Sequence, residues 1–126
     1  SEKMMDKKKE VADKAYDLAD FTVKDAKKQD DDSYVVTVVI KPSDVFSNSS
    51  NYVNDIATEY ADQGKDPTQT DVLMDILVES LNRAIEANSY GDETTLEVHV
   101  TADKDGAYGI EESEMETLEA TMFPGE

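Results

Sequence analysis

The sequence predicts an α+β domain: a small antiparallel sheet of about four strands, built from two hairpins, with helices packed mainly on one face. Two segments, 34–42 and 94–102, are rich in β-branched residues, and each has a neighbouring segment that suits a hairpin partner. Other segments repeat apolar residues at helical spacing. The expected order is α-β-β-α-α-β-β-α, and 126 residues suit a single domain, 1–126.

The first helix is expected from about Lys3 to Leu18, where apolar residues recur at helical spacing among lysines and aspartates. A competing interpretation extends this helix through Lys28, because Ala, Lys and Asp are tolerated in helices. The Phe-Thr-Val triplet at 21–23 argues against that extension.

A first hairpin is expected from residues 19–29 and 33–41, joined by a polar turn. Its second strand is apolar on both faces, which is typical of a strand in the interior of a sheet. Pro42 ends that strand, because proline cannot donate to a ladder.

Two helices are expected in the middle of the chain. The stripe within 52–60 predicts the second helix, with Asn48, Ser49 or Ser50 as its N-cap and Gly64 as its end.

For the third helix, Thr68 and Asp71 have the spacing of a capping box, and a broad apolar stripe covers 72–85. Asn88 and Gly91 follow as stop signals.

The last third of the chain predicts a second hairpin and a final helix. Residues 94–102 alternate between apolar and polar side chains, Asp105-Gly106 favours a tight turn, and 107–110 return as a short strand. Residues 111–123 carry one apolar stripe and begin with acids, which suit a helix N-terminus.

The composition excludes several classes of partner. With 30 acids against 12 bases the formal net charge is −18, which repels nucleic acid and anionic membrane surfaces. The absence of cysteine excludes disulfides, thiolate nucleophiles and cysteine metal sites. No segment has the length of a membrane span or the apolar core of a signal peptide, although Ser1 at the first position is compatible with a removed leader.

One segment invites a test for calcium binding. With Gly106 at the sixth loop position, Asp103, Asp105 and Glu112 fall on ligand positions, but Thr101 takes the first position, where a carboxylate is needed. The segment also follows a strand instead of a helix. An ordinary hairpin turn is therefore favoured.

Catalytic chemistry finds little support. His99 is the only histidine and is expected to be solvated on the outer face of a strand, so neither a zinc site nor a triad can be argued around it. No glycine-rich phosphate loop occurs, and Arg83 is the only arginine that could clamp an anion. We predict no catalytic, cofactor-binding or metal-ligating residues, and an enzyme is the less favoured class.

A candidate interaction face does follow from the strand pattern. If the other face of the sheet is covered by helices, one face is left half apolar and half polar. It consists of Val35, Thr37, Val39, Glu97 and His99.

Two segments carry a resemblance to a known family. Tyr-Val-Val-Thr-Val-Val-Ile-Lys-Pro-Ser-Asp from Tyr34 and Val-Thr-Ala-Asp-Lys-Asp-Gly-Ala-Tyr-Gly-Ile from Val100 resemble domains of unknown function in Gram-positive cell-envelope lipoproteins. The resemblance spans roughly 21–118. It implies an extracytoplasmic domain, tethered in the full-length form by a lipidated cysteine upstream of Ser1, and it implies no reaction.

Three functional hypotheses follow. The first is a non-enzymatic extracytoplasmic binding or interaction domain of a cell-envelope protein, whose partner is a protein or a small molecule. The alternative is a small-ligand-binding or enzymatic domain, cystatin-like or nuclear-transport-factor-like, with a sheet-helix pocket lined by tyrosines and acids near His99. The third is a dimerising module that forms a homodimer through the candidate interaction face.

Overall fold

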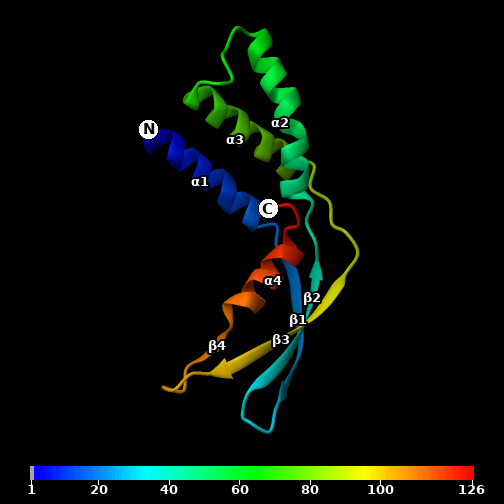
Figure 1. Ribbon diagram of the computed structural model, residues 1–126. Coiled ribbons are helices and arrows are strands. Elements are labelled where there is room, and N and C mark those ends of the chain that lie inside the picture. Colours follow the sequence, from blue (N-terminus) through cyan, green and yellow to red (C-terminus); the bar gives the residue numbers. More distant parts are fainter. Residues whose placement is uncertain (1) are drawn as a thin grey trace.

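The computed structural model describes residues 2–126, and an antiparallel sheet forms the lower half of the molecule (Figure 1). Its strands are β1 (Asp20–Lys28), β2 (Tyr34–Lys41), β3 (Thr94–Ala102) and β4 (Tyr108–Ile110). They lie in the order β1-β2-β3-β4, so each strand pairs with its neighbour in sequence. The apolar strand β2 is interior to the sheet, as its two apolar faces predict.

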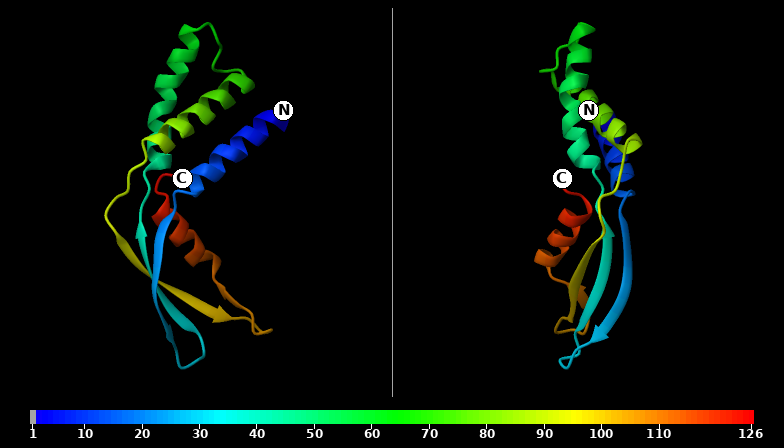
Figure 2. Two further views of the ribbon diagram at one scale, coloured as in Figure 1. Left: turned by 180° about the vertical axis from the view of Figure 1, so that it is seen from behind. Right: turned by 90° about the vertical axis from the view of Figure 1, so that its right-hand side faces the viewer.

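The helices divide between two places. α1 (Glu2–Tyr16), α2 (Val45–Asp62) and α3 (Thr70–Glu86) pack on one another beyond one end of the sheet, whereas α4 (Glu112–Met122) packs against β3 and β2. α1 and α4 end close together and diverge toward their N-termini on the same side of the molecule, so that they form a V (Figures 1 and 2). The predicted α+β class and the predicted element order are confirmed.

The first hairpin is confirmed, and the extension of the first helix through Lys28 is wrong. In the observed register Phe21 pairs with Ile40 and Val23 with Val38, so the alternation of β1 places its apolar residues on the same face as those of β2. A helix through this segment would lose that match. After Val23 the register shifts at a β-bulge.

The start of the second helix was predicted too late. α2 begins at Val45, with Asp44 at the N-cap position. The Asp44 carboxylate accepts the backbone N–H of Ser89 at 2.9 Å and its hydroxyl at 2.7 Å, and the Ser43 hydroxyl accepts the N–H of Val45 at 3.2 Å. These contacts between segments distant in sequence fix the start of α2, and a local cap signal does not reveal them.

The predicted capping box at Thr68 is also wrong. α3 begins at Thr70 and its N-cap residue is Gln69, without a side-chain cap. The Thr68 hydroxyl instead donates to Asp66 Oδ1 at 2.7 Å, and the Thr68 N–H donates to the same oxygen at 2.9 Å. Asp66 therefore organises a turn ahead of the helix and occupies the hydroxyl that a cap would need.

The remaining elements agree with the prediction within one or two residues. Gly64 follows α2 with φ of 81°, as expected of a residue that ends a helix. Asp103 Oδ1 accepts the N–H groups of Asp105 and Ala107 at 2.8 and 3.0 Å, and Gly106 has φ of 83°. The segment that invited a calcium test is thus the turn between β3 and β4.

The core consists of two clusters that meet at Met122. One lies among the helices and includes Ala15, Val45, Ala84 and Phe123, and the other joins β2 and β3 to α4. Met122 packs against both clusters.

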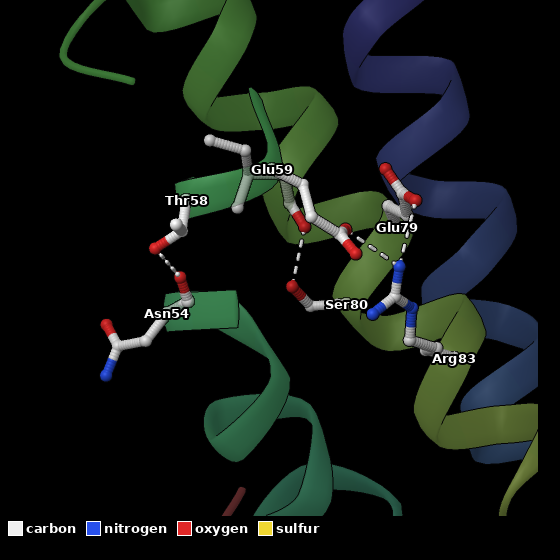
Figure 3. A network of polar contacts seen from close by, with 7 residues as sticks. Asn54, Thr58, Glu59, Glu79, Ser80 and Arg83 are labelled. Atoms are coloured by element: carbon white, nitrogen blue, oxygen red, sulfur yellow. Dashed lines mark hydrogen bonds and ion pairs between the residues drawn. The ribbon is translucent and has the colours of Figure 1, made fainter. Parts of the chain in front are cut away.

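Aromatic rings and the ion pairs of Arg83 connect parts of the helical region. The ring centroid of Phe123 lies 5.4 Å from that of Tyr16 and 5.6 Å from that of Phe46. Figure 3 shows Arg83 of α3 between Glu59 of α2 and Glu79 of its own helix, with N–O distances of 3.0 and 3.5 Å. The arginine considered as an anion clamp therefore ties α3 to α2.

Candidate functional site

A groove lined wholly by apolar side chains lies between the sheet and α4. Its volume is about 290 Å³. The strands form its floor and α4 forms one wall. Its lining residues are Phe21, Val23, Val36, Val38, Ile40, Val98, Val100, Ile110, Met115, Leu118 and Met122.

The groove follows from the alternation of three strands. Val23 pairs with Val38, which pairs with Leu96 on the other side, and Val36 pairs with Val98. Because side chains alternate along a strand, each such row places apolar residues on one face. On α4, Met115, Leu118 and Met122 are spaced by three and four residues and point toward this face.

One side of the groove is open to solvent. Phe21 and Val23 of β1 are 55% and 57% exposed, whereas their partners on β2, Ile40 and Val38, are 0% and 7% exposed. The difference arises because α4 packs mainly against β3 and β2. In the right-hand view of Figure 2, α4 lies beside β3, and β1 lies at the far side of the sheet.

The position of α4 is fixed at its C-terminal end by Ser43, which precedes α2, and by Ser47 in the first turn of α2. The backbone N–H of Ser43 donates to the carbonyl of Met122 at 2.8 Å, and the Ser47 hydroxyl donates to the carbonyl of Pro124 at 3.1 Å. Gly125 has φ of 80°, and a Cβ there would lie 2.5 Å from Ser47 Oγ, so this close approach requires glycine.

At its N-terminal end, α4 is fixed by Glu114 and His99. The His99 backbone N–H donates to both oxygens of the Glu114 carboxylate, at 3.2 and 3.1 Å, and His99 Nδ1 lies 2.7 Å from Oε1. The hydrogen bond to Glu114 and the charge of this carboxylate raise the pKa of His99, and the charges of Glu97 and Glu111 act in the same direction. The imidazole therefore contributes to positioning α4 over the groove.

The two flanks of α4 differ. Glu114 lies on the flank that meets β3. Glu112, Glu116 and Glu119 are spaced by four and three residues, so they form a line along the opposite flank, where Glu116 and Glu119 border a second hollow with Phe123 and Glu126. The side-chain hydrogen bond between Glu119 and Glu126, together with the charge of Glu126, raises the pKa of Glu119.

The residues predicted as an interaction face do lie together, on the opposite face of the sheet. Val35 pairs with His99, Thr37 with Glu97, and Val39 lies two residues further along β2. The three β2 side chains are half-buried, and the two on β3 are exposed. That this face binds a partner stays a prediction.

The pocket between sheet and helix differs from the one that the alternative hypothesis requires. Its lining contains neither a tyrosine nor an ionisable side chain, and His99 does not line it, because its imidazole contacts Glu114. What the groove offers to a ligand is apolar surface, without a group for acid-base or nucleophilic chemistry. Within residues 2–126, no cluster of three or more His, Cys, Asp or Glu side chains is placed to hold a metal ion.

Sequence reasoning found the floor of the groove but missed its open side. The alternation of Phe21 and Val23 predicts a strand, but it does not indicate whether their face of the sheet is covered. The available signal was the shortness of the final helix, 111–123, with methionines at both ends of its apolar stripe. A helix of that length covers part of a four-stranded sheet, and methionine is common at adaptable binding surfaces.

Comparison with known proteins shows a fold related to a lipoprotein domain. No family model matches the chain, and no curated protein matches it. Among solved structures, the chain is similar to ycdA of Bacillus subtilis, a candidate lipoprotein, with a TM-score of 0.58 and 15% sequence identity. The match covers 82% of this chain and 33% of that one, so the chain spans about a third of its neighbour's length. In the described part of the chain, no helix has the length and apolar character that crossing a bilayer requires.

Proposed function

We propose that the chain is a non-enzymatic binding domain of an extracytoplasmic, cell-envelope protein, and that the apolar groove is its binding site. The observation that carries this proposal is the exposure of Phe21 and Val23 beside a wholly apolar pocket. Large apolar side chains gathered on the surface of a soluble domain are typical of sites that bind another molecule. The similarity to a candidate lipoprotein supports the envelope location.

The size and shape of the groove favour a segment of a partner over an enclosed small molecule. Its volume of about 290 Å³ lies at the lower end of the range for ligand pockets, and one side is open. A row of apolar side chains presented by a partner suits such a groove, because the partner itself closes the open side.

The experiment uses Nile red, a neutral apolar dye, and two neighbouring substitutions on β1. Val23→Asp places a charge at the mouth of the groove, whereas Thr22→Asp adds the same charge on the opposite face, where Thr22 pairs with Val39. We expect the wild type to bind the dye, with a blue-shifted emission, and Val23→Asp to weaken binding at least about fivefold, since burying an unpaired charge is costly.

Thr22→Asp is expected to bind Nile red as the wild type does. The proposal is wrong if the wild type does not bind the dye, or if the two substitutions weaken binding equally.

A further inference from the structure

The face of the sheet that α4 occupies is left uncovered at β1. Neighbouring strands lie about 4.8 Å apart, so the four strands span about 14 Å, whereas a helix with its side chains is about 10 Å wide. α4 packs over β3 and β2. At the usual interaxial distance of about 8–10 Å, a second helix beside α4 would contact the exposed Phe21 and Val23 with its apolar side and extend past the edge of the sheet at β1.

The wall of this space carries negative charge. α4 contains no basic residue, and Glu112, Glu116 and Glu119 follow one another along the flank opposite Glu114, where Glu116 and Glu119 also border a hollow beside Phe123. A helix lying beside α4 would bring its own residues, at the same helical spacing, opposite these three glutamates. Charged residues on the flanks of paired helices interact in this way. Basic residues at those positions are stabilised there, and acidic ones are repelled.

Two other occupants fit less well. A second copy of this chain carries the same net charge of −18, so two acidic surfaces would be brought together. A strand added to the edge of β1 meets the β-bulge after Val23 and the side chains of Lys24, Asp25 and Lys27, which are devices that protect an edge from pairing.

We propose that the partner is a basic amphipathic helix that lies over β1 beside α4, with its apolar stripe in the groove and its basic residues facing Glu112, Glu116 and Glu119. This inference rests on the proposed function, because it names the class of molecule that the groove binds. The basic flank on the partner supplies specificity, and the apolar stripe supplies most of the buried area.

Two synthetic helical peptides test the inference. They share one leucine stripe at helical spacing and differ only in the flanking residues, which are lysine in one peptide and glutamate in the other. We expect the lysine peptide to bind, to displace Nile red and to gain helical circular dichroism, and the glutamate peptide to bind at least about tenfold more weakly at low salt.

A matched pair of triple variants locates the charge effect. Replacing Glu112, Glu116 and Glu119 by glutamine is expected to weaken the lysine peptide about three- to tenfold, as three exposed ion pairs would. The control makes the same change in net charge on α2 and α3, at exposed positions away from the groove, and is expected to leave the affinity within about twofold. It consists of Asp55→Asn, Asp62→Asn and Glu86→Gln.

The outcomes distinguish failure of the basic-helix proposal from failure of the proposed binding function. Equal binding of the two peptides, failure of both to displace the dye, binding without a gain of helix, or equal loss in the two triple variants would each overturn the inference. If Nile red still binds in a manner that depends on Val23, the groove remains a binding site for another apolar ligand. If the dye fails as well, the proposed function falls with the inference.

Discussion

Val23 and Val38 form a matched pair that measures how open the groove is in solution. They face each other across β1 and β2, on the same side of the sheet, but Val23 is 57% exposed and Val38 is 7% exposed. The perturbation is the same in both cases, truncation of valine to alanine, which removes two carbon atoms.

The expected costs follow from the burial of each side chain. At Val38 the removed groups are buried, so the loss is about 1.6 kcal/mol for two CH₂ equivalents plus a cavity contribution, or about 2–3 kcal/mol in total. At Val23 somewhat less than half of the side chain is buried and no cavity forms, so the corresponding loss is about 0.7 kcal/mol.

Urea denaturation of both variants provides the assay, with the free energy of unfolding obtained by linear extrapolation. We expect Val38→Ala to be less stable than Val23→Ala by about 1.5–2 kcal/mol. Equal losses at the two positions would refute the reasoning, because they would mean that Val23 is covered in solution by another element or another molecule.

Three further predictions concern the contacts that position the sheet and α4. Ser43→Ala should lower the free energy of unfolding by about 1–3 kcal/mol, because the buried hydroxyl donates to Asn88 Oδ1 at 2.5 Å. The control, Ser50→Ala at an exposed site, should change the free energy of unfolding little. Similar losses in both variants would contradict a stabilising role for the Ser43 hydroxyl. Glu114→Gln should lower the pKa of His99 in an NMR titration. Because the folded-state pKa is raised, the stability that this pair supplies is complete below the unfolded pKa of about 6.5 and is lost as pH rises through the folded value. His99→Gln should therefore cost more stability at about pH 5.5 than at about pH 8.5, and a larger cost at the higher pH would contradict this sign.

The sequence predicts the elements of this fold well where one pattern governs a segment. The alternation of Phe21 and Val23 matches the apolar face of β2, so local pattern and tertiary pairing agree and the first hairpin is recognisable. The same agreement holds in residues 94–102 and at the turn before Gly106.

Prediction fails where a distant contact, or a competing local one, overrides the signal in the sequence. The start of α2 depends on Ser89, which lies beyond α3 in the chain and binds the Asp44 carboxylate. Thr68 has the spacing of a cap, but its hydroxyl is taken by Asp66. Competing hydrogen bonds of nearly equal strength decide such cases, and a single sequence does not rank them.

The candidate site was harder to predict for a related reason. The alternation of apolar and polar residues along the strands identifies both faces of the sheet. It favours the mixed face of Val35 and His99 as the interaction face, because helices are expected to cover the apolar face. How far a helix covers a face depends on where its ends are fixed. For α4, those ends depend on Ser43 and Glu114, which the periodicity of α4 itself does not reveal.

Mapping of the lysine peptide by NMR tests the central claim most directly, because it reports which face of the sheet is bound. With methyl groups labelled, we predict that chemical shifts change on titration at Val23, Ile110 and Met115, which line the groove. The methyl groups of Val35 and Val39, on the opposite face, should stay constant. Changes confined to Val35 and Val39, or no changes at saturating peptide, would contradict the assignment of the groove as the binding site.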